Sequence, residues 1–150
     1  MIDYARIPKE IIPLLEEKLK GRDDEIDFPP PVFDAMKGEV IEYDIDKESI
    51  TNRFPVLKEH LNPYGNMQGG IIAAAIDNTI GPLSLIVSPP NFTRYMEVKY
   101  GKVVSPDLGY IYVTARFVEQ KRRQLFFEAV VKNGDGEKLA SAKATHWVID

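Results

Sequence analysis

The chain has no cysteine among its 150 residues, which rules out disulfide bonds and thiolate-bound metal sites. It also has no excess of basic residues, because 19 Lys and Arg stand against 23 Asp and Glu, for a formal net charge of -4. Without a broad basic surface, contacts with phosphates are disfavoured, so we expect no nucleic-acid partner. The N-terminus lacks the basic start and apolar stretch of a signal peptide, and no uninterrupted apolar run reaches membrane-spanning length. We therefore expect no membrane partner and a cytoplasmic location.

The composition that remains is that of a globular protein, with 44% hydrophobic and 28% charged residues. The length suits one domain with a real core and is short for two. Apolar residues at helical spacing predict an amphipathic helix over residues 9–20, ending before Gly21. Three consecutive prolines predict that residues 27–38 form an irregular connection.

Beyond this connection the pattern predicts two strands, one helix and four further strands. The predicted strands cover residues 39–46, 49–56, 92–104, 109–120, 124–132 and 138–149. Turn residues separate them, and NGDG between the last two is the strongest hairpin signal. This order of elements predicts an α+β domain with a largely antiparallel sheet.

The central helix follows the pair Gly69 and Gly70, and every residue in the range 71–76 is apolar. A helix that is apolar all round is typical of a core, so we expect this one to be buried. Gly81 and Pro82 predict that it ends or kinks soon after Asp77.

A carboxylate in such a helix, at Asp77, costs free energy unless it is paired or has a function. One interpretation is a structural carboxylate, held by a backbone donor or an arginine. The other is catalytic. The first turn of a helix presents unpaired N–H groups, and Gly69 and Gly70 would let a ligand approach them closely. The helix would then offer N–H donors at its start and a carboxylate about two turns later.

These residues carry a resemblance. The stretch NPYGNMQGGIIAAAIDN, residues 62–78, is similar to the signature of hotdog-fold acyl-CoA thioesterases of the PaaI-like type, in the 4-hydroxybenzoyl-CoA thioesterase superfamily. That signature places Asn, Gly, His-Gly-Gly and an Asp or Glu at fixed offsets, and the matching positions here are Asn62, Gly65, Gly69, Gly70 and Asp77.

The resemblance implies a hotdog fold, in which an antiparallel sheet wraps around a central helix, here with an extra N-terminal helix. We expect a single domain over residues 1–150, with the hotdog core at 38–150. Residues 1–37, the N-terminal helix and the proline-rich connection, would be additions to it.

The resemblance also implies an activity, the hydrolysis of an acyl-CoA thioester. The Gly69 N–H would polarise the thioester carbonyl, and Asp77 would act as general base or nucleophile. Asn62 and Gln68 would position the substrate, with Gly65 and Gly70 contributing to substrate binding. We expect no metal and no cofactor, coenzyme A being part of the substrate.

Gln68 is a departure from the family, which usually has histidine at this position. Glutamine can donate a hydrogen bond but cannot gain and lose a proton near neutral pH. A thiolate leaving group has a pKa of about 8.5, as cysteine has, so it departs with little help from an acid. We therefore expect thioester cleavage to tolerate the change.

The resemblance implies a homodimer or a dimer of dimers, in which sheets join edge to edge. In similar enzymes a Ser or Thr on the strand after the helix reaches the neighbouring subunit's site, which would place Thr93 near Asp77 of the other chain. Thr93 could equally be an ordinary β-branched strand residue. Arg122 and Arg123, in a predicted turn, are either solvated or meet the phosphates of coenzyme A.

Two other functions stay open at this point. Gln68 would suit a non-catalytic protein that binds acyl-CoA or acyl chains. A hotdog enoyl-thioester hydratase or dehydratase would need a histidine opposite Asp77, and His60 is the candidate. His146 alternates with the alanines of the last strand, which indicates a core or edge histidine. Either coenzyme A or acyl carrier protein could carry the acyl group.

Overall fold

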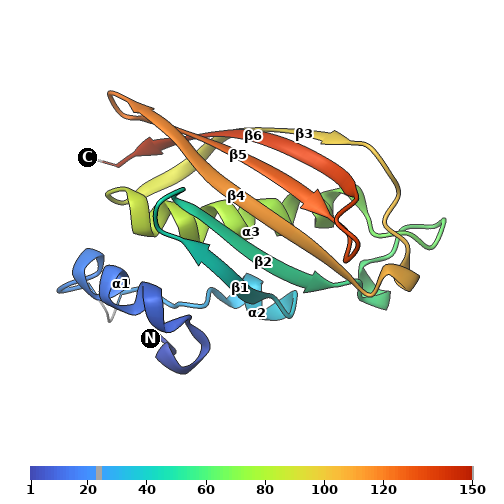
Figure 1. Cartoon of the computed structure of the whole chain (residues 1–150), viewed down its shortest axis with the longest axis horizontal. Helices are drawn as coiled ribbons and strands as arrows, with labels where there is room; N and C mark the ends of the chain where they lie inside the picture. The colour runs from blue at the N-terminus through green and yellow to red at the C-terminus, as the bar shows by residue number, and fades with distance from the viewer. Residues whose placement is uncertain (23–24, 150) are drawn as a thin grey trace.

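The computed structural model describes residues 1–22 and 25–149 (Figure 1). A six-stranded antiparallel sheet wraps around α3 (Gly69–Val87), in the order β1-β2-β4-β5-β6-β3. The strands are β1 (Glu39–Asp44), β2 (Ser49–Pro55), β3 (Asn91–Tyr100), β4 (Tyr110–Lys121), β5 (Gln124–Lys132) and β6 (Lys138–Val148). The predicted strands and central helix are confirmed, and so is the predicted α+β class.

The third strand is shorter than predicted. β3 ends at Tyr100, whereas the pattern predicted a strand to residue 104. The N–H groups of Gly101 and Lys102 both bond to the carbonyl of Leu139, and the carbonyl of Val104 accepts the N–H of Met67 at 2.8 Å. The chain therefore leaves the sheet after Tyr100 and pairs with the loop before α3.

The N-terminal segment forms the predicted helix, α1 (Ile12–Lys18), preceded by two short 3-10 turns, η1 (Tyr4–Arg6) and η2 (Lys9–Ile11). Its apolar side packs on the C-terminal part of α3, where Ile86 joins the cluster. The buried members of this cluster are Ile7, Ile11, Leu15, Leu19, Phe28 and Ile86. The N-terminal helix therefore covers the end of the central helix.

The proline-rich connection is not wholly irregular, which corrects the prediction. It contains a short helix, α2 (Pro31–Ala35), that begins at the third proline. Proline is tolerated there because the first N–H groups of a helix have no helical acceptor. Phe33 of α2 is buried against Phe54, with ring centroids 5.6 Å apart, so the helix is anchored to the main core.

Of the two predicted outcomes at Gly81 and Pro82, an end of α3 is wrong, because the helix continues to Val87 with Pro82 inside it. Proline has no N–H, so the carbonyl of Asn78, four residues earlier, lacks its helical donor. Asn52 on β2 supplies a replacement, since its Nδ2 lies 3.3 Å from that carbonyl oxygen. A tertiary contact thus keeps the helix continuous.

The expectation that this helix lies in the core is confirmed on the side that faces the sheet, but the helix is not buried all round. The sheet covers one side of α3, where β2, β3 and β4 approach it. On the opposite side a half-buried stripe runs at helical spacing, formed by Ile71, Ala74, Asp77 and Gly81. Asp77 therefore faces partly open space.

α3 has the length and composition of a membrane span, with 19 residues and a mean hydropathy of 1.6. The sequence-based expectation missed this because Asp77 interrupts the apolar run. The helix is the core helix of the sheet, and 56% of its most apolar window is buried in the fold. A buried core helix can have the same length and apolar composition as a membrane-spanning helix.

Candidate active site

Asp77 is paired with Thr93. The Thr93 hydroxyl donates a hydrogen bond of 2.9 Å to Asp77 Oδ1. Both residues belong to the same chain, so the prediction that Thr93 reaches Asp77 of the other chain is wrong. The cause is the short turn from Ser88 to Pro90, after which β3 runs back along α3, so that Asn91 lies beside Ser84 and Thr93 beside Asp77. One chain therefore supplies both members of the pair.

A β-bulge turns Thr93 toward the helix. Met96 and Val98 lie on the core side of β3, so regular alternation would put Thr93 on the outer side. The register shifts between Thr93 and Tyr95, which leaves Arg94 as the extra residue. The bulge thereby restores Thr93 to the face that looks at Asp77.

His146 extends this pair into a chain of polar contacts that leads from the exposed Thr93 to a buried histidine. It lies opposite Thr93 on β6, is 2% exposed, and its Nε2 is 3.3 Å from the Thr93 hydroxyl oxygen. Its Nδ1 is 2.8 Å from Oδ1 of Asn91. Burial lowers the pKa of His146, and the nearby Asp77 carboxylate acts in the opposite direction.

The sequence-based interpretation of His146 as a core histidine is right about its burial and missed its place beside the site. Asn91 was missed altogether. The alternation that put His146 on the inner face of β6 was visible in the sequence. The pairing of β6 with the start of β3 was not.

The start of α3 presents two unpaired amides. Gln68 precedes the helix with an exposed side chain that makes no capping hydrogen bond, and its carbonyl accepts the N–H groups of Ile71 and Ile72. Within residues 1–22 and 25–149, the N–H groups of Gly69 and Gly70 have no acceptor. A Cβ on Gly70 would meet nothing within 4 Å, and one on Gly69 would touch the Tyr100 ring only at 3.4 Å. Packing within this chain does not require either glycine, and the space beside the amides is open.

A hollow of about 270 Å³ lies beside this helix start, lined in part by Asn62, Met67, Gly69, Tyr100 and Val104. The Tyr100 hydroxyl donates to the carbonyl of Gly69 at 2.9 Å, which fixes one wall.

The loop before α3 accounts for two more predicted residues. Asn62 Oδ1 accepts the N–H groups of Tyr64 and Asn66, at 2.9 and 3.2 Å, so this side chain shapes its own loop. Gly65 has a φ of 79°, a conformation that favours glycine. Both residues therefore have structural roles in this loop, and Asn62 also lines the hollow.

The helix start and the carboxylate are far apart within one chain. Gly69 and Asp77 are eight residues apart on α3, which is about 12 Å along a helix axis. One thioester carbonyl cannot accept a hydrogen bond from Gly69 and meet a water held by Asp77 of the same chain. The structure thus brings Asp77 and Thr93 together, and separately brings together Asn62, Gln68, Gly69 and Gly70.

The predicted basic pair lies at the end of the sheet that holds Thr93. Arg122 is exposed in the β4–β5 turn with a φ of 57°. The Arg123 guanidinium donates to the carbonyl of Val148 at 3.0 Å and lies 5.7 Å from the Trp147 ring. Arg94 packs on the same ring at 4.2 Å. Two cations, Arg94 and Arg123, therefore contact one tryptophan near the start of β3, and Arg122 follows in the adjacent turn.

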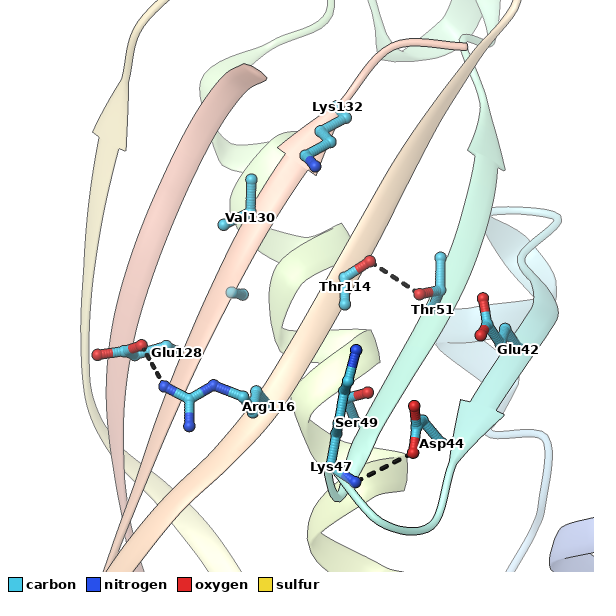
Figure 2. Close-up of a pocket in the computed structure, with 11 residues that line it drawn as sticks. Glu42, Asp44, Lys47, Ser49, Thr51, Thr114, Arg116, Glu128, Val130 and Lys132 are labelled. Atoms are coloured by element: carbon cyan, nitrogen blue, oxygen red, sulfur yellow. Dashed lines mark hydrogen bonds and ion pairs between the residues drawn. The ribbon is translucent and has the colours of Figure 1, made fainter. Parts of the chain in front are cut away.

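A second hollow, of about 390 Å³, contains none of the predicted site residues. Figure 2 shows its polar side chains on the face of the sheet turned away from α3. Its groups pair with one another, as Arg116 does with Glu128 at 2.9 Å and Thr51 with Thr114 at 2.8 Å. We interpret it as a solvated outer face of the sheet.

A curved antiparallel sheet wrapped around one long helix is the hotdog fold, and solved structures confirm this assignment. No protein-family model and no curated protein matches the chain. A mutant form of the phenylacetic acid degradation protein PaaI from Thermus thermophilus is similar with a TM-score of 0.72 and 19% identity, over 80% of this chain and 100% of that one. A mutant thioesterase from Pseudomonas aeruginosa is similar with a TM-score of 0.73 and 16% identity, over 90% and 91% of the two chains.

A third similar structure is the protein smu.793 from Streptococcus mutans bound to acetyl CoA. Its TM-score is 0.68 and its identity 22%, over 75% of this chain and 88% of that one. At these identities the likeness establishes the fold. The predicted structural resemblance to PaaI-like thioesterases is confirmed.

Proposed function

We propose that the protein is an acyl-CoA thioesterase in which Asp77 activates the attacking water. The observation that carries the proposal is the Asp77–Thr93 hydrogen bond on the half-buried stripe of α3. A hydroxyl that holds one carboxylate oxygen fixes the rotamer and leaves the other oxygen to orient water. Thioesterases among the similar structures, and one similar protein with bound acetyl CoA, support this choice of substrate class.

The reaction needs a base, a donor for the carbonyl oxygen and a tolerable leaving group. Asp77 takes a proton from water while the water oxygen bonds to the thioester carbon. The Gly69 N–H, at the positive end of the helix dipole, stabilises the oxyanion that forms. The carbon–sulfur bond then breaks, and the thiolate leaves without needing a proton from Gln68.

The separation of Gly69 from Asp77 indicates that two copies of the chain build each site. We propose a homodimer in which the start of α3 of one copy faces Asp77 and Thr93 of the other. β3 lies at an edge of the sheet, and Phe92 and Tyr95 are exposed on it. Edge strands of this kind are prone to pair with another chain, and two-fold pairing satisfies both edges at once.

A thiol-release assay over acyl-CoAs of different chain length tests the activity. Asp77→Asn should lower kcat by roughly 10²-fold or more, the scale of a lost general base. Asp135→Asn, in the exposed β5–β6 turn, is the matched control and should behave as wild type. Undiminished turnover in Asp77→Asn would remove this residue from the chemistry.

Two further measurements, made beside the thiol-release assay, separate the other two functions. Binding of acyl-CoA without thiol release would identify a binding protein. Hydration of an enoyl-CoA without thiol release would identify a hydratase. The cytoplasmic location and the absence of any metal or cofactor requirement stay predictions.

A further inference from the structure

Three contacts, from Asp77 to Thr93, from Thr93 to His146 and from His146 to Asn91, join Asp77 to the interior of the sheet. The positions of the protons in these contacts can be assigned. Asn91 Nδ2 donates to the carbonyl of Pro89 at 2.9 Å and to that of Ser84 at 3.4 Å. Reversing the amide would set its oxygen against these carbonyls, so Asn91 Oδ1 is the atom that faces His146 Nδ1. An amide oxygen only accepts hydrogen bonds, and Nδ1 of His146 therefore carries a proton.

A neutral imidazole with its proton on Nδ1 has an acceptor at Nε2. The Thr93 hydroxyl, with one proton, then lies between two acceptors, His146 Nε2 at 3.3 Å and Asp77 Oδ1 at 2.9 Å. If one more proton is added to this group, both contacts of Thr93 become hydrogen bonds. It can sit on Nε2, so that Thr93 donates to Asp77, or on Asp77, so that Thr93 donates to His146.

We propose that Thr93 and His146 form a proton relay behind Asp77, through which His146 receives the proton that Asp77 takes from water. This inference rests on the proposed thioesterase activity. The protonated Asp77 gives its proton to the Thr93 oxygen as the Thr93 hydroxyl proton passes to His146 Nε2. The carboxylate is regenerated, His146 becomes an imidazolium, and reversal of the same steps returns the proton to the departing thiolate or to solvent.

The surroundings of His146 suit a temporary proton acceptor. β5 presents Leu125 and the Phe127 ring, whose centroid is 4.9 Å from that of the imidazole. β3 presents Thr93 and Asn91, which are not charged. In the part of the chain that the structure describes, Asp77 is the charged group that acts on His146. Since burial lowers the pKa of His146, the resting imidazole is neutral and ready to accept.

The tautomer of His146 gives a test that needs no substrate. Imidazole ¹⁵N shifts of the wild-type protein at neutral pH should show the proton on Nδ1, with His60 as a second histidine for reference. Asn91→Leu removes the acceptor for that proton and should shift His146 toward the Nε2–H form. A wild-type His146 with its proton on Nε2 would overturn the relay, because that nitrogen could not accept from Thr93.

Kinetics give the second test. His146→Gln keeps a polar side chain that cannot take up a proton, and Thr93→Val breaks the link. His146→Gln should lower kcat about tenfold with KM unchanged, a modest share of what proton transfer contributes in enzymes. Thr93→Val should lower kcat at least as much, because its hydroxyl also fixes the Asp77 rotamer. The double variant should lose no more than Thr93→Val alone, because the link to His146 is already broken there, whereas Thr93→Ser should keep wild-type kcat. Losses that add, or equal losses in Thr93→Ser and Thr93→Val, would contradict the relay.

The pH profile separates proton transfer from packing. Wild-type kcat should fall as the pH drops through the pKa of His146, which burial places below its ordinary value of 6.5. In His146→Gln that component should disappear. A wild type that releases no thiol from any acyl-CoA would overturn the proposed function. Normal turnover with an Nε2–H tautomer would overturn the relay alone.

Discussion

The side chain of Asn52 on β2 donates a hydrogen bond to the carbonyl oxygen of Asn78 on α3, at 3.3 Å. Pro82 leaves this oxygen without a helical donor. Asn52 is 0% exposed and also lies 3.3 Å from the Thr79 hydroxyl, so a buried amide holds the middle of the helix. Asp77 directly precedes Asn78. The segment that carries the proposed base therefore depends on a side chain from the sheet.

Asn52→Leu should lower the free energy of unfolding by about 1–3 kcal/mol, since it leaves a buried carbonyl unpaired. In a Pro82→Ala background the new N–H at position 82 can bond to the same carbonyl, so the cost should be smaller. Urea unfolding of the two single variants and the double variant measures this coupling. Equal costs in both backgrounds would show that Asn52 does not compensate for Pro82.

Mixing of inactive variants should reveal how the site is divided between chains. Gly69→Pro removes one amide donor at a helix position where proline is tolerated, and Gln68 already has the extended conformation that precedes proline. Gly69→Pro and Asp77→Asn should each have low activity alone. After subunit exchange, activity should partly return, because each hybrid dimer has one site with both wild-type residues.

The matched control is a mixture of Asp77→Asn and Thr93→Val. These residues share one chain's half of the site, so no hybrid site contains both in wild-type form, and activity should not rise above that of the two variants before exchange. Recovery in the control without recovery in the first mixture would contradict the division proposed here. Thiol release before and after exchange is the measurement.

Gln68 should act only as a hydrogen-bond donor. Its side chain is exposed beside the Gly69 amide and makes no capping bond, so it is available to a substrate. Gln68→His should keep or raise kcat/KM, and Gln68→Ala should lower it by less than about tenfold, as expected for one neutral hydrogen bond. An alanine variant that matches wild type would make the residue a spectator.

Arg122 should bind the nucleotide part of the substrate. Arg122→Gln should raise KM for acyl-CoA about tenfold, the scale of a charge-assisted hydrogen bond to phosphate. KM for an acyl thioester of N-acetylcysteamine, which lacks phosphates, should not change. Arg123→Gln is less informative, because it would also remove the hydrogen bond from Arg123 to the carbonyl of Val148. Equal effects of Arg122→Gln on both substrates would contradict phosphate binding.

The sequence was sufficient for the fold because its signals are local or depend on a strict period. The strands alternate, NGDG makes a hairpin, and the spacing of Gly69, Gly70 and Asp77 indicated the central helix and its carboxylate. Pro82 was misjudged because its local preference is overridden by Asn52, a residue of β2 that no local pattern links to it.

The candidate site was predicted only in part, because the register of β3 against β6 could not be predicted from the sequence. The hydroxyl of Thr93 faces Asp77 because of a bulge at Arg94, and a bulge adds one residue without any change of composition. His146 and Asn91 join the site only through the pairing of β6 with β3 and the turn before β3. Such contacts between distant segments are decided by the assembled sheet.

α3 bears both an N–H donor and a carboxylate, and in the proposed dimer these serve different sites. A rigid helix transmits displacement along its axis, so a thioester drawn onto Gly69 in one site also moves the Asp77 that belongs to the other. The two sites would then be mechanically linked without any separate effector. Half-of-sites reactivity, with the second turnover waiting on release from the first, is the kinetic behaviour that this linkage favours.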